Sequence, residues 1–175
     1  MITFHISGIN KAMQELRAYA ASLPVKMRLL VQLLMDEGWD IANAGFASAL
    51  RSGINDVKVV RPYWEGNTMY LVAEGEYVAF IEFGTGTYYS DYPGKLPDGI
   101  VPHGEYGLGL GKDPPWIYVG EAGNHGAVLR KGKNGKADVV MTNGDPPARA
   151  MYDASKVLDR DHIEQVAREV FNGRY

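Results

Sequence analysis

The chain has 175 residues, a formal net charge of −3 and no cysteine. This length suits one domain, and it is enough to bury a hydrophobic core without a metal or a disulfide. The lack of cysteine excludes disulfides, thiolate metal ligands and cysteine nucleophiles. The acidic balance argues against a free-standing nucleic-acid-binding protein, which usually carries a basic face. The start of the chain and its short apolar runs lead us to expect neither a signal peptide nor a membrane span.

Helices dominate the predicted N-terminal part of the chain. Residues 2–6 alternate apolar and polar side chains, which predicts a short strand at the start. Apolar residues recur at helical spacing over residues 10–22, and Pro24 predicts a break there, followed by a long helix from about 24 to 50. We expect this long helix to be the spine of the fold, with Trp39 in the core. Two glycines within it each weaken a helix by about 1 kcal/mol, so we expect them to allow a bend or close packing: Gly38 and Gly45.

A hairpin and a short helix are predicted next. Residues 57–60 and 68–73 have the composition of paired strands, joined by a turn at residues 65–67. In residues 77–83, helical spacing competes with an aromatic content typical of strands. We favour a short helix for this segment.

Residues 84–145 are rich in Gly and Pro, a composition that predicts a long loop of the kind that often carries function. Weak strands are predicted within it near residues 116–119 and 138–141. Residues 130–136 form a basic segment that we expect to be an exposed tip, turning at Asn134-Gly135.

The C-terminal part is predicted to be helical. A double proline precedes a helix that reaches about residue 158. Asp161, with Glu164 three residues later, predicts the capped start of a last helix, which has a clear apolar face and ends at Gly173. The whole chain, residues 1–175, is therefore predicted to be one α+β domain. A small antiparallel sheet should pack against the long N-terminal helix and a C-terminal helix, with a long, variable Gly/Pro-rich loop insertion over about 87–145.

No catalytic or metal site can be assembled from motifs. The Gly-rich run at 107–112 resembles a phosphate-binding loop, but Tyr106 stands where that motif needs Gly and Asp113 where it needs Ser or Thr. Asp36 and Asp40 share a helix face, which is more typical of a solvated acidic surface than of a metal site. The four histidines lack the spacing of metal ligands: His5, His103, His125 and His162.

Hydrolase chemistry has no better support. The chain has no Gly-x-Ser-x-Gly nucleophile motif. Glu74, Glu76 and Glu82 lie close in sequence, yet nothing indicates that two of them face each other across a substrate. We therefore expect no catalytic residues, no metal site and no cofactor.

The segment Glu-Phe-Gly-Thr-Gly at 82–86 is the most distinctive in the chain. Glu82 and Thr85 can hydrogen-bond to nearby backbone and hold a turn. Alternatively, Glu82 can pair with Arg149, which follows the double proline and opens a helix. Such an Arg–carboxylate pair would hold the two ends of the long loop together.

At these motifs the chain resembles the neck proteins of long-tailed bacteriophages and prophages, which complete the tail and join it to the head. The order of features is similar: Ile-Ser-Gly-Ile at 6–9 before a leucine-bearing helix, a long helix, Tyr-Val-Ala-Phe-Ile-Glu-Phe-Gly-Thr-Gly at 77–86, and Pro-Ala-Arg-Ala-Met-Tyr at 147–152. The resemblance covers most of the chain and departs from the family at about residues 88–136, which are longer and richer in Gly. The motif residues singled out are Glu82, Phe83, Gly84, Thr85, Gly86, Pro147, Ala148 and Arg149.

The resemblance implies a structural virion protein that is not an enzyme. It implies an α+β protomer in a ring, a hexamer, around the axial channel between head connector proteins and tail-terminator or tail-tube proteins. Genome DNA would pass through the lumen without sequence-specific binding, which suits an acidic protein. The implied location is the virion neck, with assembly in the host cytoplasm and no membrane partner.

Aromatic residues of the loop region are of the types that anchor protein interfaces. Packing of the loop on its own domain is an equally good interpretation. The candidate interface residues are Tyr88, Tyr89, Tyr92, Trp116 and Tyr118. Three alternatives to a neck protein remain at this point: a tail-terminator or minor tail protein, a phage-borne nuclease or cell-wall hydrolase, and a monomeric host-directed binding module.

Overall fold

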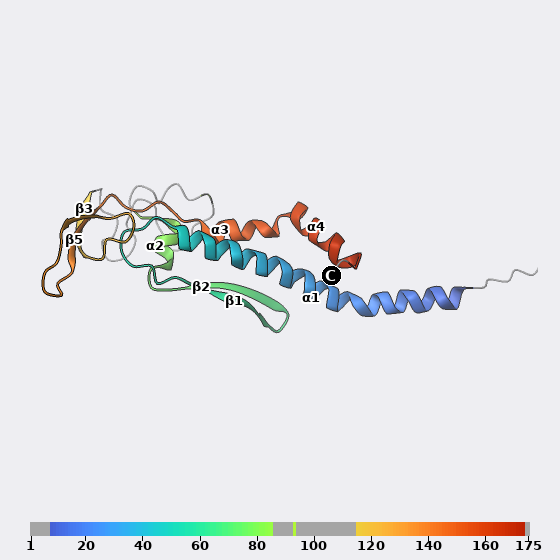
Figure 1. Cartoon of the computed structure of the whole chain (residues 1–175). Helices are drawn as coiled ribbons and strands as arrows, with labels where there is room; N and C mark the ends of the chain where they lie inside the picture. Colours follow the sequence, from blue (N-terminus) through green and yellow to red (C-terminus); the bar gives the residue numbers. More distant parts are fainter. Residues whose placement is uncertain (1–7, 86–92, 94–114, 174–175) are drawn as a thin grey trace, which may run out of the picture.

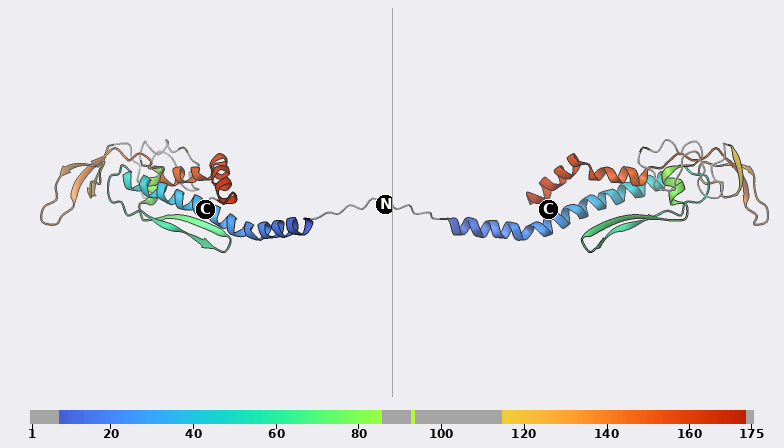
Figure 2. Two further views of the ribbon diagram at one scale, coloured as in Figure 1. Left: turned by 45° about the vertical axis from the view of Figure 1, so that its right-hand side comes forward. Right: turned by 180° about the vertical axis from the view of Figure 1, so that it is seen from behind.

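A single helix of 40 residues, α1 (Ile9–Ser48), is the longest element of the protein. The computed structural model describes residues 8–85, 93 and 115–173. In this part of the chain the other elements gather around the C-terminal half of α1, and its N-terminal half projects away from them (Figure 1). Two further views show the same elongated outline (Figure 2). The strand predicted at residues 2–6 lies outside the described residues.

The predicted break at Pro24 is wrong, because α1 continues through this proline. Proline in a helix removes the hydrogen bond to the carbonyl four residues earlier and crowds that carbonyl. Here that carbonyl belongs to Ala20, which is exposed, so water can satisfy it. The hydroxyl of Ser22 donates to the carbonyl of Tyr19 (2.7 Å) in the same turn. α1 changes direction in its N-terminal half, as helices commonly do at proline (Figure 1).

The predicted hairpin is confirmed. Strands β1 (Lys58–Glu65) and β2 (Thr68–Glu74) pair antiparallel through a two-residue turn. β1 is longer than predicted. Its register shifts between Val60 and Tyr63. This irregularity accommodates Pro62, which has no N–H to donate to the neighbouring strand. The hairpin packs on α1. Trp39, predicted in the core, is partly buried and packs against it, and its Nε1 donates to the carbonyl of Val59 in the hairpin (3.1 Å).

The short helix predicted at residues 77–83 is confirmed as α2 (Val78–Phe83). The C-terminal part forms α3 (Ala150–Ser155), a 3₁₀ turn η2 (Lys156–Leu158) and α4 (Arg160–Phe171). The predicted cap of α4 is wrong, because Asp159 occupies the N-cap position and Asp161 lies in the first turn. Glu164 forms ion pairs with Arg160 and Arg168 instead of completing a capping box.

Two hydrophobic clusters hold these elements on α1. The larger lies where α1 meets the hairpin, α2 and α3, and contains Ala42, Phe46, Ala49, Val59, Ile81, Ala150 and Ala154. The smaller lies where α1 meets η2 and α4, and contains Leu30, Leu34, Val157 and Val170. Packing of apolar residues from both ends of the sequence against one helix confirms that α1 is the spine of the fold.

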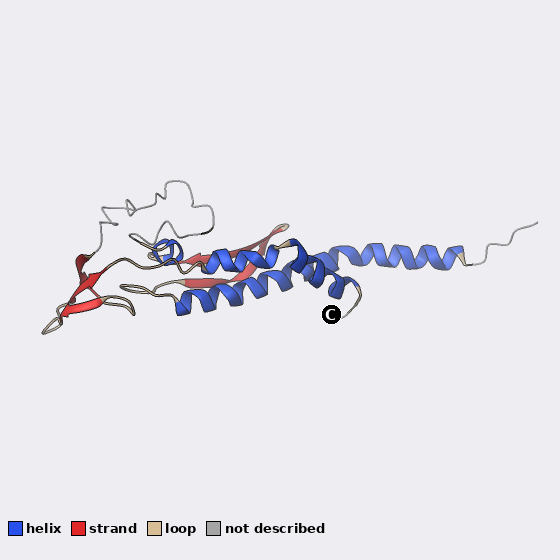
Figure 3. Ribbon diagram, turned by 90° about the horizontal axis from the view of Figure 1, so that it is seen from above, coloured by secondary structure: helices blue, strands red, loops and turns tan. Residues whose placement is uncertain are grey.

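A second sheet lies beyond the C-terminal end of α1 (Figure 3). Its strands are β3 (Trp116–Gly120), β4 (Ala127–Arg130) and β5 (Asp138–Thr142), in the order β3-β5-β4, all antiparallel. The two weak predicted strands are therefore confirmed as β3 and β5. β4 escaped prediction because all four of its residues are exposed and show no alternation. The positive φ of Asn134 (53°) and Gly135 (77°) confirms the predicted turn.

The α+β class is confirmed, with the correction that the strands form two separate sheets and not one. Among the described elements, the β1-β2 hairpin packs directly on α1, and the three-stranded sheet makes no comparable contact with it. The three-stranded sheet is fastened to the end of α1 by Asn124, whose Oδ1 accepts from the Arg51 amide (2.7 Å) and whose Nδ2 donates to the Ala49 carbonyl (3.0 Å). Among the described helices, none has both the length and the apolar character needed to cross a membrane.

The two glycines of α1 allow close packing, and they should respond differently to substitution. A Cβ on Gly45 would lie 2.7 Å from the Cβ of Ala150, whereas a Cβ on Gly38 would meet its neighbours at 3.4–3.5 Å. We expect Gly45→Ala to destabilise the protein by about 2 kcal/mol, because α1 and α3 must separate. Gly38→Ala should be neutral or stabilising by up to about 1 kcal/mol, the gain in helix propensity. Urea unfolding of both variants tests this, and equal effects would contradict it.

Candidate functional site

The two sequence motifs, 65 residues apart in the chain, meet in the structure. The amide of Ala148 donates to the carbonyl of Ile81 (2.8 Å), and the amide of Arg149 donates to the carbonyl of Glu82 (3.2 Å). These bonds join the C-terminal end of α2 to the segment that opens α3. We call residues 81–85 and 145–149 together the motif junction.

A second pair of bonds lies at the other end of the motif junction. The amide of Thr85 donates to the carbonyl of Asp145 (2.8 Å), and the amide of Asp145 donates to Oγ1 of Thr85 (2.9 Å). Thr85 therefore hydrogen-bonds to backbone, as one sequence interpretation expected, but the backbone is 60 residues away. The motif junction closes the long loop region at its two ends.

Glu82 supplies the missing cap of α3. Its side chain is buried, with the residue 4% exposed. The carboxylate accepts from the amide of Met151 (3.1 and 3.0 Å) and from the amide of Tyr152 (3.0 Å). These amides belong to the first turn of α3, where helix N–H groups have no partner within the helix. Arg149, at the N-cap position, makes no side-chain cap, so the acceptor comes from another element.

Arg149 itself is held in an uncommon conformation, with φ 58° and ψ 21°. Residues other than Gly adopt this left-handed region at a cost of about 1–2 kcal/mol, and such strain tends to occur where the surrounding structure demands it. Here both the amide of Arg149 and the carboxylate of Glu82 are fixed by the motif junction. The pairing of the Glu82 and Arg149 side chains stays a prediction.

Gly84 is required by the same junction. Its φ of 80° and ψ of 179° place it in a region that is essentially open only to glycine. A Cβ at this position would lie 2.7 Å from the carbonyl oxygen of Asp145 and 2.7 Å from the nitrogen of Pro147. The Gly of the motif therefore lets two backbone segments approach closely.

Asp145 is the centre of a polar network next to the motif junction. Its Oδ2 accepts from the amide of Ser52 (2.8 Å), and its Oδ1 accepts from the hydroxyl of Ser52 (2.8 Å) and from Nδ1 of His125 (3.1 Å). Because a carboxylate only accepts here, Nδ1 of His125 must carry a proton. Asp145 is nearly buried, and these bonds compensate the loss of water around its charge.

The hydroxyl groups of this network form a directed chain. The amide of Gly144 donates to Oγ1 of Thr142 (3.0 Å), which lies 2.7 Å from Oγ of Ser52. Since Ser52 uses its single proton on Asp145, Thr142 must donate to Ser52. This series of hydrogen bonds ends on the Asp145 carboxylate. It holds together β5, the segment after α1 and the motif junction.

Ser52, His125 and Asp145 are the residue types of a hydrolytic triad, but they are connected differently. In a triad, histidine stands between serine and aspartate and accepts the serine proton. Here the Ser52 hydroxyl bonds directly to Asp145 and Thr142. The Ser52 hydroxyl thus donates its proton to the Asp145 carboxylate. These bonds hold separate elements of the fold together.

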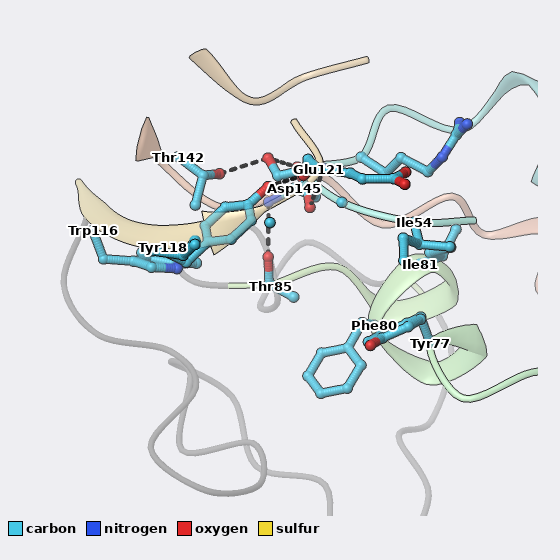
Figure 4. Close-up of a pocket in the computed structure, with 15 residues that line it drawn as sticks. Ile54, Tyr77, Phe80, Ile81, Thr85, Trp116, Tyr118, Glu121, Thr142 and Asp145 are labelled. Atoms are coloured by element: carbon cyan, nitrogen blue, oxygen red, sulfur yellow. Dashed lines mark hydrogen bonds between the residues drawn. The ribbon is translucent and has the colours of Figure 1, made fainter. Parts of the chain in front are cut away.

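A cavity of about 330 Å³ lies beside the motif junction and the Asp145 network (Figure 4). Its apolar and aromatic lining comes from α2, β3 and the loop after α1, through Ile54, Tyr77, Phe80, Ile81, Trp116 and Tyr118. Asp145 and Glu121 add acidic groups to the lining, and Arg51 adds one basic group. Cavities of this size with a few polar groups are typical of sites that receive a ligand or a side chain.

Tyr118 connects the cavity to the acidic network. Its hydroxyl donates to the carbonyl of Glu121 (2.7 Å). The pKa of Tyr118 is raised above its ordinary value, mainly by partial burial and to a smaller extent by the negative charge of Asp145. Tyr118 is therefore a neutral hydrogen-bond donor throughout the physiological pH range.

A second candidate surface is the projecting half of α1. Its apolar residues recur at alternating steps of four and three, which places them along one face of the helix. We call this face the apolar seam, formed by Ile9, Met13, Leu16, Ala20, Leu23 and Met27. All six residues are exposed in the protein, and Leu16 is 67% exposed. The same spacing continues into Leu30 and Leu34, which α4 and η2 cover within the chain.

The predicted site residues have mixed outcomes. Glu82, Phe83, Gly84, Thr85, Pro147, Ala148 and Arg149 all lie at the motif junction. Of the predicted interface residues, Trp116 and Tyr118 line the cavity. Gly86, Tyr88, Tyr89 and Tyr92 lie outside the described residues, as do His5, His103 and the Gly-rich run at 107–112.

Four residues of the polar network were missed by the sequence interpretation: Ser52, His125, Thr142 and Asp145. Asp56 was missed too, although its carboxylate accepts from the amides of Glu76 (2.6 Å) and Tyr77 (3.2 Å) before α2. The available signal was indirect. Tyr77 and Arg149 precede α2 and α3, and neither is a residue type that caps helices, so an acceptor must come from elsewhere.

Comparison of the chain with protein-family models, with curated proteins and with solved structures found no match. Among the described residues, no three histidine or acidic side chains are grouped so that they could hold a metal ion. Two acidic residues of α1 have other contacts: Asp36 accepts from Gln32 (3.0 Å), and Glu37 lies 2.8 Å from Nε2 of His162.

Proposed function

We propose that this chain is a structural protein of the phage neck, which completes the tail and joins it to the head as a ring around the DNA channel. The apolar seam of α1 is the observation that carries the proposal. Helices in proteins gain most of their stability from packing of an apolar face against other elements, whereas the seam residues of α1 are exposed in the protein. A continuous exposed apolar surface marks a site of protein interaction. The seam therefore favours a protein whose working state includes further chains.

The motif junction adds support of a different kind. The segments through which the chain resembles neck proteins, at 77–86 and 147–152, contact each other through backbone bonds and the Glu82 cap. A motif pair with a shared structural task is more informative than two short matches in isolation. We infer that these residues maintain the protomer and that the exposed surfaces bind its neighbours.

The charge of the chain is compatible with this role. A net charge of −3 does not favour binding to phosphate, because binding to DNA depends on basic residues that displace counterions. DNA can then move through a ring without being retained. A tail-terminator or minor tail protein would use the same kind of surfaces, so the experiment below must separate these roles.

Deletion of the gene from its phage or prophage tests the proposal. We expect filled heads and separate tails of normal length that fail to join, and a loss of infectious particles of several orders of magnitude. Expression of the wild-type chain from a plasmid should restore joining. Electron microscopy and particle counts give the readout. Normal infectious particles would refute a structural role, and tails of irregular length would favour a tail terminator.

A further inference from the structure

The turn between β4 and β5 carries a concentration of positive charge. Residues 130–136 contain four basic side chains and no acidic one, and no other seven consecutive residues of the chain contain as many basic side chains. We call this segment the basic tip, with the cations Arg130, Lys131, Lys133 and Lys136. Of the 18 basic residues, these four leave 14 against 21 acidic ones, so the rest of the chain carries −7. The net charge of −3 therefore conceals a strong local separation of charge.

We propose that the basic tip contacts the phosphate backbone of duplex DNA without reading its sequence. The inference goes beyond the proposed function, in which DNA passes through a ring, because it gives DNA a point of contact on each protomer. It is carried by the position of the tip, by the freedom of its cations and by its composition.

The basic tip extends beyond the three-stranded sheet. β3 ends at Gly120, which pairs with Asp138, the first residue of β5. Only the connection between β4 and β5 therefore continues past this point. It projects at the end of the molecule opposite the projecting half of α1 (Figures 1 and 2). A two-stranded ribbon is narrow enough to enter the major groove of DNA, which the phosphate backbones border.

The backbone of the basic tip is held in a defined turn. The amide of Gly132 donates to Oδ1 of Asp138 (2.8 Å), and the amide of Lys136 donates to the carbonyl of Lys133 (3.2 Å). Between these bonds the chain reverses at Asn134-Gly135, where both residues have positive φ. A segment that is ordered before binding loses less conformational freedom when it binds.

The four cations of the basic tip are available to a ligand. All four are exposed. Among the described residues, none of the four has an ion pair or a side-chain hydrogen bond. Two acids lie at the same end of the sheet, Asp138 and Glu121, which follows Gly120. Asp138 already accepts from the Gly132 amide, and the cations outnumber these acids by two to one.

An acidic protein surface is the other partner that four cations would suit. Protein interfaces are anchored by aromatic residues and Arg, whereas Lys is depleted in them. The basic tip has no aromatic and no apolar side chain, and three of its four cations are Lys. Lys binds phosphate as a point charge on a flexible stem, without a fixed bidentate geometry. The composition of the tip therefore favours a phosphate backbone.

Contacts of this kind are compatible with the movement of DNA. Binding to phosphates is independent of sequence and lets a protein slide along the duplex. In a ring, several weak contacts act together, so DNA is held near the axis while each single contact exchanges. The charge of −7 on the rest of the chain limits phosphate contact to the tip.

Binding of a labelled DNA duplex to the full chain tests the proposal, with fluorescence anisotropy as the readout. We expect a dissociation constant of about 10⁻⁴ M or lower at about 20 mM salt. Each phosphate contact contributes about −0.9 to the slope of log K against log salt, so four contacts predict a slope of about −3.6. Tripling the salt concentration should then weaken binding about fifty-fold. Duplexes of unrelated sequence should bind equally.

A triple variant and a matched control separate the tip from the overall charge. The tip variant is Lys131→Gln/Lys133→Gln/Lys136→Gln. The control, Lys11→Gln/Arg17→Gln/Lys58→Gln, removes the same charge from exposed residues of α1 and β1. Circular dichroism verifies that both variants fold. We expect the tip variant to bind at least about 100-fold more weakly than the wild type, and the control to stay within about threefold of it.

The proposal is overturned if the wild type does not bind at protein concentrations up to about 1 mM, or if its affinity does not fall with salt. It is also overturned if the tip variant binds as well as the wild type, or if the control loses as much affinity. Labelled poly-glutamate is the last comparison, and equal affinity for it and for the duplex would assign the tip to an acidic protein surface instead. The neck assignment is judged separately, by the particles that form without the gene.

Discussion

Glu82→Ala should destabilise the protein by about 3 kcal/mol. The substitution removes the carboxylate that accepts from the Met151 amide (3.0 and 3.1 Å) and from the Tyr152 amide (3.0 Å). A buried donor without a partner costs about 1–3 kcal/mol, and bonds to a charged acceptor are the stronger ones. The loss also separates α2 from α3, so the motif junction as a whole is weakened.

Urea unfolding followed by circular dichroism measures this effect. Glu82→Gln should lose about half as much stability. The amide oxygen of Gln can still accept from the Met151 and Tyr152 amides, but its NH₂ group is a donor and would face the Met151 amide, which is also a donor. Glu76→Ala is the control, since Glu76 is exposed and contributes its backbone amide to the Asp56 cap. Its effect should stay within about 0.5 kcal/mol. A Glu82→Ala variant as stable as the control would show that the cap is dispensable.

Local patterns in the sequence were sufficient for most of the secondary structure. The period of apolar residues located α1 and α4, and the turn at Asn134-Gly135 was visible from composition because few residues tolerate positive φ. Pro24 shows the limit of local rules. Its penalty is real, but the neighbouring carbonyl at Ala20 is exposed, and exposure is a property of the folded chain.

The polar network around Asp145 could not be predicted for a related reason. Ser52 and Asp145 are 93 residues apart, and Asp145 and His125 come from different loops. No spacing rule connects them, since their positions depend on how β5 and the end of α1 meet. The sequence predicted that Glu82 and Arg149 lie close together, and in the structure the amide of Arg149 donates to the carbonyl of Glu82 (3.2 Å). The cap that Glu82 provides was invisible because its partners are backbone amides, which every residue has.

Gly84→Ala should have the other large effect, a loss of about 3 kcal/mol or more in the free energy of unfolding. The backbone at Gly84 is in a region that is essentially closed to alanine, which costs about 1–3 kcal/mol. The added methyl would also lie 2.7 Å from two backbone atoms, of Asp145 and Pro147, which cannot move as a flexible side chain can. Overpacking of this kind costs about 1–3 kcal/mol more.

Gly66→Ala separates these two contributions. Gly66 also has a positive φ (61°), but a Cβ there would meet nothing within 4 Å. Its substitution should cost only the backbone preference, about 1–2 kcal/mol. The difference between the two variants in urea unfolding then measures the close approach of the two motif segments. If Gly84→Ala were no more harmful than Gly66→Ala, the segments would not need to approach so closely, and the motif glycine would serve only the turn.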